Sequence, residues 1–460
     1  MAITGVEELR PSSRGALSQL RARIDAFIAS EHFSTQKAAG TAFVIRIASA
    51  GIVFGSQVLL ARWLGSSEFG SYVYVWAWLL LIGDLVHFGL PLTAQRFIPE
   101  YSEAKSLDLL RGYLRGSRLL CFGTGAATAL LGAVLVYALR DALDPNLILP
   151  FYLACLALPA YVLSFMSDGV ARSYNWMNLA LIPAYVVRSL LLIVGVAVVR
   201  LAGVPLDADN VVAVLAVAAW LAVIAQMLQL DYRLRRAVPK GPRQYVPRLW
   251  FSVALPMVFV WGLYTLLTTT DVLVLKQFRP AAEVAHYFAA AKVLALISMV
   301  HFAVSASTAH RFTAYQVADD RKGLADFAVT TVRWVFWVSL AFTMAILSVG
   351  GPLLLLFGPD FVSGYPVMAV LAVGMLARAS VGPVERLLNM LGHQRVCAFA
   401  YMGAFGVNLA SCLLLAPYYG AIGAGIATSA GFVVESLLLF VVAKRSAGVH
   451  MFIWRAGMRK

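Results

Sequence analysis

Apolar runs of about 20 residues, separated by short polar stretches, recur along the chain from Ala38 to its C-terminal region. A run of this length is what an α-helix needs to cross the hydrocarbon core of a bilayer. The pattern predicts twelve spans, at roughly residues 38–61, 69–93, 117–139, 147–167, 176–199, 210–230, 250–275, 282–308, 333–357, 364–384, 396–416 and 420–443. The expected fold class is an all-α polytopic membrane protein.

Composition agrees with this class, because 61% of the 460 residues are hydrophobic and only 13% are charged. A soluble globular domain has a much lower apolar and a higher charged fraction. The cysteines stand singly in apolar segments with no CxxC pair, at Cys121, Cys155, Cys397 and Cys412. Neither a disulfide framework nor a metal site is predicted from them, and no motif calls for a cofactor.

The net charge of +14 would suggest nucleic-acid binding in a soluble protein, so the placement of the basic residues matters. With the N-terminus inside, 28 of the 37 Lys and Arg residues fall on the cytoplasmic side and four lie within spans. The opposite side holds five, which are Arg62, Arg140, Arg200, Lys276 and Arg279. This is the positive-inside distribution of a membrane protein. It predicts two cytoplasmic termini, membrane lipids as surroundings, and no nucleic-acid partner.

Residues 1–36 have no apolar stretch resembling a signal-peptide core and are expected to stay in the cytoplasm. Apolar residues recur there at helical spacing, at Leu17, Leu20, Ile24, Phe27 and Ile28. Two interpretations remain open, which are a short amphipathic helix on the inner membrane surface and a partly ordered tail.

An internal repeat appears at an offset of 215 residues, which follows from the pairs Glu68 with Glu283 and Tyr72 with Tyr287. The same register aligns residues 93–97 with residues 308–312 and Arg118 with Arg333. Parallel repeats predict two pseudo-symmetric six-helix lobes around a central cavity. The expected divisions are a cytoplasmic segment 1–36, an N-lobe 37–230, a cytoplasmic linker 231–249, a C-lobe 250–443 and a cytoplasmic tail 444–460.

Ionisable side chains inside spans are expensive, so each needs a partner, water or a ligand. Four of these residues are cations, and together they form a candidate basic lining for an anion such as a pyrophosphate: Arg46, Arg188, Lys292 and Arg378. The alternative is that these cations pair locally with Asp84, Asp271 and Glu385.

Arg46 and Asp84 each lie nine residues inside the membrane from the cytoplasmic end of their spans, about 13 Å deep at 1.5 Å per residue. They either pair with each other or leave Arg46 facing the cavity. His87, three residues after Asp84, is either a proton-sensitive partner of that carboxylate or a hydrogen-bonded packing residue. Asp84, His87 and Asp271 are therefore candidate coupling or gating residues.

Three stretches carry a family resemblance. They are Leu59 to Tyr72, with the turn Arg62-Trp63-Leu64-Gly65; Thr268 to Leu275, with Asp271; and Phe357 to Phe361 followed by Asn408 and the segment Pro417 to Thr428. These stretches resemble the polysaccharide and lipid-linked oligosaccharide flippases of the multidrug/oligosaccharidyl-lipid/polysaccharide exporter superfamily.

The resemblance implies alternating access in a bacterial inner membrane. A polyprenyl-pyrophosphate-linked repeat unit would enter a cytoplasm-facing cavity, the lobes would rock, and the sugar would emerge in the periplasm for surface or exopolysaccharide synthesis. Polysaccharide polymerase and export proteins are then possible partners. Asp271 lies near the periplasmic end of its span, which favours packing or gating over ligation of a coupling ion.

Two other classes compete with this interpretation. A cation-coupled multidrug exporter of the same superfamily would share the span count, but its cavity is expected to be acidic. A membrane glycosyltransferase or polysaccharide polymerase is disfavoured, since the outward loops are short and no nucleophile and base constellation appears. The chain is expected not to be an enzyme.

Overall fold

The computed structural model describes residues 31–297, 320–390, 394–454 and 457–458. Helices make up almost all of them. In the first half they are α2 (Glu31–Val86), α3 (Leu90–Glu103), α4 (Leu107–Ala138), α5 (Pro145–Ser173), α6 (Met177–Leu181), the π-helix η1 (Ile182–Val187), α7 (Arg188–Leu201) and α8 (Ala208–Ala237).

The second half starts with α9 (Pro247–Phe278) and a helix that runs from residue 281 to residue 297. There follow α11 (Arg321–Ser348), α12 (Gly350–Leu355), the 3-10 helix η2 (Pro359–Gly364), α13 (Tyr365–Val381), α14 (Val384–Met390), α15 (Gln394–Val442) and the π-helix η3 (Ala443–Ala447). Two short strands, β1 (Val449–His450) and β2 (Gly457–Met458), pair antiparallel near the C-terminus.

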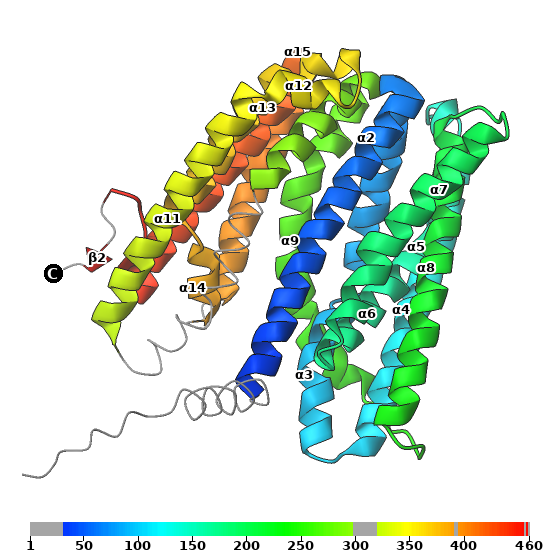
Figure 1. Ribbon diagram of the computed structural model, residues 1–460, viewed down its shortest axis with the longest axis vertical. Helices are drawn as coiled ribbons and strands as arrows, with labels where there is room; N and C mark the ends of the chain where they lie inside the picture. Colours follow the sequence, from blue (N-terminus) through cyan, green and yellow to red (C-terminus); the bar gives the residue numbers. More distant parts are fainter. Residues whose placement is uncertain (1–30, 298–319, 391–393, 455–456, 459–460) are drawn as a thin grey trace, which may run out of the picture.

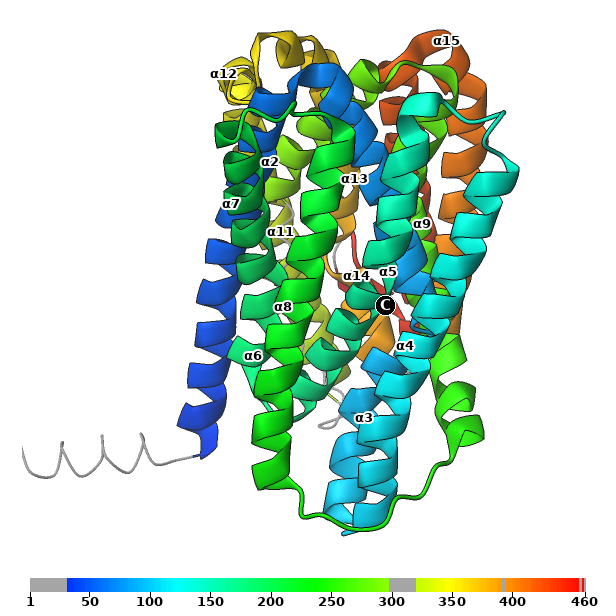
Figure 2. The ribbon, with the colours of Figure 1, turned by 90° about the vertical axis from the view of Figure 1, so that its right-hand side faces the viewer.

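The helices form two bundles that stand side by side in Figure 1, and in the turned view of Figure 2 helices α4, α5, α6 and α8 lie in front. We call α2 to α8 the N-bundle and the helices from α9 onward the C-bundle. The bundles converge at one end, where α2 and α15 bend, and diverge toward the other end, where the chain crosses between them (Figure 1). We call the first the kink end, after the bends at Gly65 and Gly420, and the second the linker end, after residues 238–246.

Within the described parts of the chain, nine helical segments are long and apolar enough to cross a membrane. Two of these, Ile45–Glu103 and Val396–Arg445, cross twice because each reverses at a glycine. Gly65 and Gly420 have φ angles of 76° and 57°. Residues that carry a Cβ rarely adopt positive φ angles. With the helix that begins at residue 281, the chain has about twelve membrane-crossing helices, and the predicted all-α fold class is confirmed.

The 215-residue repeat is visible in equivalent hydrogen bonds at the kink end. Glu68 Oε2 accepts from the backbone N–H of Ala208 at 2.9 Å, at the first residue of α8. Glu283 Oε1 accepts from the N–H of Ala421 at 2.7 Å, directly after the bend at Gly420. Both carboxylates therefore satisfy a free N–H at the start of the last long helix of their bundle. The aligned segment 308–312 lies outside the described residues.

The linker between the bundles is fixed to the first turns of α4. Arg111 donates through Nε to the carbonyl of Pro239 at 2.7 Å and pairs through Nη1 with Asp108 Oδ1 at 2.7 Å. The backbone N–H of Gln244 donates to the carbonyl of Asp108 at 2.9 Å. Gly112 permits this approach, since a Cβ there would lie 1.7 Å from the carbonyl oxygen of Gln244. These contacts bind the linker to the surface of the N-bundle.

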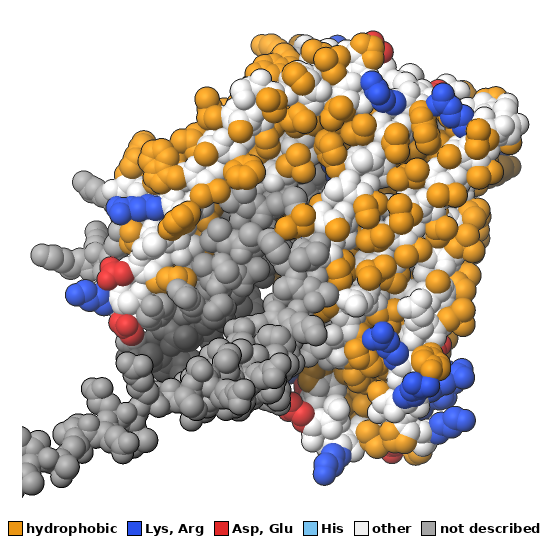
Figure 3. All heavy atoms as spheres, viewed as in Figure 1, with side chains coloured by type: hydrophobic (Ala, Val, Ile, Leu, Met, Phe, Trp, Pro, Cys, Tyr) orange, Lys and Arg blue, Asp and Glu red, His pale blue; other side chains and the backbone are white. Residues whose placement is uncertain are grey.

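On the face seen in Figure 3, hydrophobic side chains cover much of the surface between the two ends, and most Lys and Arg side chains lie near the ends. This arrangement matches a bilayer with polar regions above and below it. The expected amphipathic segment within residues 1–36 falls largely outside the described residues, which begin at residue 31.

Candidate functional site

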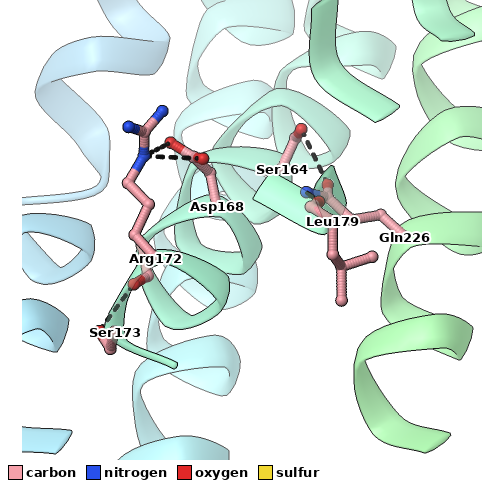
Figure 4. A network of polar contacts seen from close by, with 7 residues as sticks. Ser164, Asp168, Arg172, Ser173, Leu179 and Gln226 are labelled. Carbon is pink, nitrogen blue, oxygen red and sulfur yellow. Dashed lines mark hydrogen bonds and ion pairs between the residues drawn. The ribbon is translucent and has the colours of Figure 1, made fainter. Parts of the chain in front are cut away.

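The interior of the N-bundle is shaped by an interruption of its fifth crossing. Pro183 has no N–H to offer the carbonyl of Leu179 four residues earlier, and the helix continues as η1. Gln226 of α8 donates through Nε2 to the Leu179 carbonyl at 3.1 Å. Its Oε1 accepts from Ser164 of α5 at 3.2 Å (Figure 4). One buried amide therefore joins three elements just before Arg188.

Arg188 is the first residue of α7 and is half-buried. Its guanidinium carbon lies 4.5 Å from the ring centroid of Tyr161 and 5.9 Å from that of Trp76. No carboxylate of the described residues forms an ion pair with it. The charge is held by the faces of aromatic rings, an arrangement that favours arginine and leaves hydrogen-bond donors for a ligand.

A second charged group in the N-bundle contains an aspartate that the sequence analysis missed. Arg172 donates through Nε to both carboxylate oxygens of Asp168, at 3.0 and 2.9 Å (Figure 4). Arg46, whose side chain is exposed, interacts electrostatically with the same carboxylate. Asp168 was missed because the predicted fourth span ended at residue 167, although α5 continues to Ser173. The i, i+4 spacing of Asp168 and Arg172 was the available signal.

Asp84 bonds across to the C-bundle. Its Oδ2 accepts from the hydroxyl of Thr265 at 2.9 Å and from the indole Nε1 of Trp261 at 3.3 Å, both in α9. The described contacts do not include an ion pair between Arg46 and Asp84. Arg46 precedes the bend at Gly65 and interacts with Asp168, whereas Asp84 follows the bend and bonds to α9.

His87 lies just beyond the end of α2 and has a local partner. Its Nδ1 accepts from the backbone N–H of Gly89 at 3.0 Å, and its ring meets Phe165 edge-on at 5.5 Å between centroids. Gly89 has a φ of 75°, and a Cβ there would lie 2.5 Å from the carbonyl oxygen of Ala254. Among the described contacts, His87 stabilises this turn, and it forms no hydrogen bond with Asp84.

Asp271 lies in a closed polar network within the C-bundle. It accepts hydrogen bonds from Tyr287, from Thr428 at 3.1 Å and from the backbone N–H of Val272 at 2.7 Å. Asn408 donates to Thr428 at 3.4 Å. Lys292 interacts electrostatically with Asp271 and has its Nζ 4.8 Å from the ring centroid of Phe288. Within the described chain Lys292 forms no ion pair shorter than 4 Å.

Arg378 is the most fully compensated of the candidate cations. Its Nε lies 3.2 Å from Oε1 of Glu435, whose side chain is only 2% exposed. The rings of Tyr264 and Phe432 lie 5.4 and 5.5 Å from its guanidinium carbon. Glu385 was one of the acids predicted to pair with these cations, whereas the ion pair of Arg378 with Glu435 joins α13 to the second half of α15.

The four candidate cations therefore differ in the partners that compensate their charge and in the bundle to which they belong. Arg46 and Arg188 lie in the N-bundle and Lys292 and Arg378 in the C-bundle, and Arg378 has a short ion pair. Arg188 and Lys292 are held by aromatic faces. Chemically, the N-bundle offers guanidinium donors for an anion, and the hydrogen bonds of Asp84 join the two bundles.

Comparison with known proteins places this arrangement in a transporter fold. The chain is similar to an inward-facing multidrug resistance MATE family transporter of the MOP superfamily, with a TM-score of 0.70 at 14% identity over 87% of this chain and 97% of that one. The lipid II flippase MurJ in an inward closed conformation gives a TM-score of 0.69 at 14% identity over 87% of each chain. An outward-facing MATE family transporter gives 0.63 at 15% identity, over 88% of this chain and 94% of that chain.

At these identities the likeness establishes the fold and no more. No curated protein matches the chain by sequence. The family model described as polysaccharide biosynthesis protein matches residues 37–309, which is more than half of the chain. The chain therefore belongs to the polysaccharide biosynthesis protein family, with the fold of the MOP transporters.

Proposed function

We propose that the protein is a flippase that moves polyprenyl-pyrophosphate-linked oligosaccharide repeat units from the cytoplasmic to the periplasmic leaflet of a bacterial inner membrane. The observation that carries the proposal is the guanidinium of Arg188, which lies against Tyr161 and Trp76 inside the N-bundle and has no carboxylate partner among the described residues. Family membership supports a role in polysaccharide synthesis.

The chemistry of the substrate explains why such a residue is needed. A pyrophosphate carries concentrated negative charge, and arginine binds phosphate oxygens through paired, charge-assisted hydrogen bonds. A guanidinium without a carboxylate can take an anion without first breaking an ion pair. Arg188 and Lys292 are therefore the primary ligands in this proposal. Arg46 and Arg378 contribute next to Asp168 and Glu435.

Transport would proceed by rocking of two bodies, residues 37–230 and 250–443, joined by the cytoplasmic stretch 231–249. We assign the linker end and both termini to the cytoplasm, because the positive-inside rule then accounts for the distribution of the basic residues. Convergence of the bundles at the kink end then corresponds to an inward-facing state (Figure 1). Asp84 acts as a latch between the bundles in that state, while His87 and Asp271 stabilise the parts that move.

The multidrug exporters of the superfamily share the fold, so the fold does not separate the two functions. The separation lies in the charge inside the bundles, since exporters of cations need acidic sites free to bind them. Here Asp84, Asp168 and Glu435 already have partners. In this proposal the protein is a transporter and not an enzyme. It associates with polysaccharide polymerase and export proteins.

The test is a strain that lacks the gene, complemented with the wild type, Arg188→Ala or the control Arg140→Ala. Arg140 is exposed near the kink end and pairs only with Asp141 and the ring of Tyr137 in the described structure. Surface polysaccharide and the pool of lipid-linked repeat units are measured at matched expression.

We expect the deletion to lose polymer and accumulate inward-facing lipid-linked intermediates, Arg140→Ala to restore both, and Arg188→Ala to restore neither. Unchanged polysaccharide in the deletion strain, together with new sensitivity to cationic drugs, would contradict the flippase function and favour a multidrug exporter. Full complementation by Arg188→Ala would remove Arg188 from the binding site.

A further inference from the structure

A second site lies at the kink end, between the two bundles and apart from the charges discussed above. It is a cavity of about 350 Å³. One wall is the bend of α2 with Arg62 and Trp63, joined by Arg200 from the end of α7. The other wall is the start of η2 with Asp360. Because each bundle supplies one wall, an occupant would touch both.

The walls carry charges of opposite sign. Arg62 and Arg200 face the cavity from the N-bundle, and Asp360 faces it from the C-bundle. All three are exposed, and none forms an ion pair with another described residue. The guanidinium carbon of Arg200 lies 5.5 Å from the ring centroid of Trp63, and Asp360 also interacts electrostatically with His286. Two guanidiniums opposite one carboxylate complement a group that carries a phosphate and a cation.

The surroundings of the cavity are apolar. Its lining includes the buried rings of Phe357 and Phe361. Leu201, which follows Arg200, is 87% exposed, and Leu355 and Leu356, which precede the lining residue Phe357, are 47% and 45% exposed. A charged recess flanked by exposed leucines and an indole at the ends of membrane spans is typical of the bilayer interface. The neighbouring surface is suited to acyl chains and not to a freely soluble ligand.

We propose that this cavity binds the headgroup of a phospholipid that carries a phosphodiester and a primary ammonium, as in phosphatidylethanolamine. The phosphate contacts Arg62 and Arg200, the ammonium contacts Asp360, and the acyl chains follow the exposed leucines. The bound lipid links the bundles where they converge and stabilises this form of the protein. The inference goes beyond the proposed function, since it assumes nothing about the transported substrate.

The test uses the full chain, purified in mild detergent and mixed with equal amounts of phosphatidylethanolamine, phosphatidylcholine and phosphatidylglycerol. Retained lipid is counted by native mass spectrometry. The variants are Arg62→Gln with Arg200→Gln, Asp360→Asn, and the control Arg140→Gln. A further arm adds soluble phosphoethanolamine as a competitor, and spectra of circular dichroism check that each variant is folded.

We expect the wild type and Arg140→Gln to retain phosphatidylethanolamine over the other two lipids. The double arginine variant should lose this lipid about tenfold, the size expected for charge-assisted hydrogen bonds. Asp360→Asn should keep lipid but lose the preference over phosphatidylcholine. Equal retention of all three lipids by the wild type, or wild-type retention by the double variant, would overturn the proposal. Displacement by soluble phosphoethanolamine would overturn the assignment to a lipid.

Discussion

Charged side chains inside the bundles differ in how their charge is compensated. Arg378 has a short ion pair with the buried Glu435, whereas Arg188 lies against aromatic faces and has no ion pair within the described part of the chain. A buried ion pair is costly to break from one side, because the remaining charge loses its partner but stays away from water. The two arginines should therefore respond differently to substitution, Arg378 through stability and Arg188 through transport.

Replacing Arg378 by Gln should destabilise the protein by about 3–5 kcal/mol, because Glu435 is left as an uncompensated buried charge. The measurement is thermal unfolding of the purified protein in detergent. Arg96→Gln is the matched control, since Arg96 and Glu100 form an exposed pair at 3.6 Å. Its loss should cost about 0–1 kcal/mol.

The double variant Arg378→Gln with Glu435→Gln should recover most of the lost stability, because neither charge is then left unpaired. Equal losses from the two single arginine variants, or no recovery in the double variant, would show that the pair is not the cause.

At this scale the sequence identified the charges but not their partners. Residue type and depth singled out Arg46, Arg188, Lys292 and Arg378, and all are described within the bundles. Asp84 bonds to α9 instead of Arg46, because the direction of a side chain depends on the rotation of its helix against a neighbour. Hydropathy carries no information on that rotation.

Among the secondary-structure elements, the interrupted fifth crossing depends on a side chain from another helix. Gln226 bonds to the carbonyl that Pro183 leaves free, and so it supports the π-helix before Arg188. Replacing Gln226 by Leu should cost about 1–3 kcal/mol, because the Leu179 carbonyl is left buried without a donor. Thermal unfolding measures this loss. Gln229→Leu, on the exposed side of the same helix, should be nearly neutral, and an equal loss there would contradict the role of Gln226.

The two bends should tolerate alanine to different degrees. Gly65→Ala should cost roughly 1–2 kcal/mol, because φ is positive but no atom lies within 4 Å of the new Cβ. Gly420→Ala should cost more, since the new Cβ would also displace Glu283 from its bond to Ala421. Gly51→Ala, in open space within α2, should stabilise by about 0.5–1 kcal/mol.

These three variants are compared by thermal unfolding under one condition. A loss for Gly51→Ala as large as that for Gly420→Ala would contradict the explanation from backbone conformation.

The elements were more predictable than their junctions. Runs of apolar residues located the crossings, and the turn motif containing Gly65 marked the first reversal. The π-helix was not predicted, because periodicity over a few residues does not separate it from an α-helix. The continuation of α5 to Ser173 was missed because Asp168 and Arg172 lower the local hydropathy while they neutralise each other.

On the scale of the whole molecule, the two bundles are held together at the kink end and by the hydrogen bonds of Asp84 to α9 (Figure 1). The repeat predicted two lobes, and the matching roles of Glu68 and Glu283 give that symmetry a physical form. The contacts between lobes were not predictable, because a repeat describes each lobe separately.

Removing the hydroxyl of Thr265 should weaken this latch. Thr265→Val is expected to shift the population about tenfold away from the form seen here, the effect of losing a hydrogen bond to a charged group. Spin labels at residues 235 and 322, both exposed near the linker end, would report the change as a shorter distance by pulsed electron spin resonance.

Thr268→Val is the matched control, because in the part of the chain that the structure describes Thr268 bonds only to carbonyls of its own helix. The same distance distribution in Thr265→Val and in the wild type would contradict the latch.

The most direct test of the central claim is translocation by the purified protein in liposomes that contain a polyprenyl-pyrophosphate-linked oligosaccharide. A lectin added outside reports how fast sugars from the inner leaflet become accessible. The wild type and Arg140→Ala are predicted to expose the inner pool at equal rates, and Arg188→Ala is predicted to be about tenfold slower or worse, as expected for the loss of a charge-assisted contact. Liposomes with the wild type that expose sugar no faster than protein-free liposomes would contradict the account.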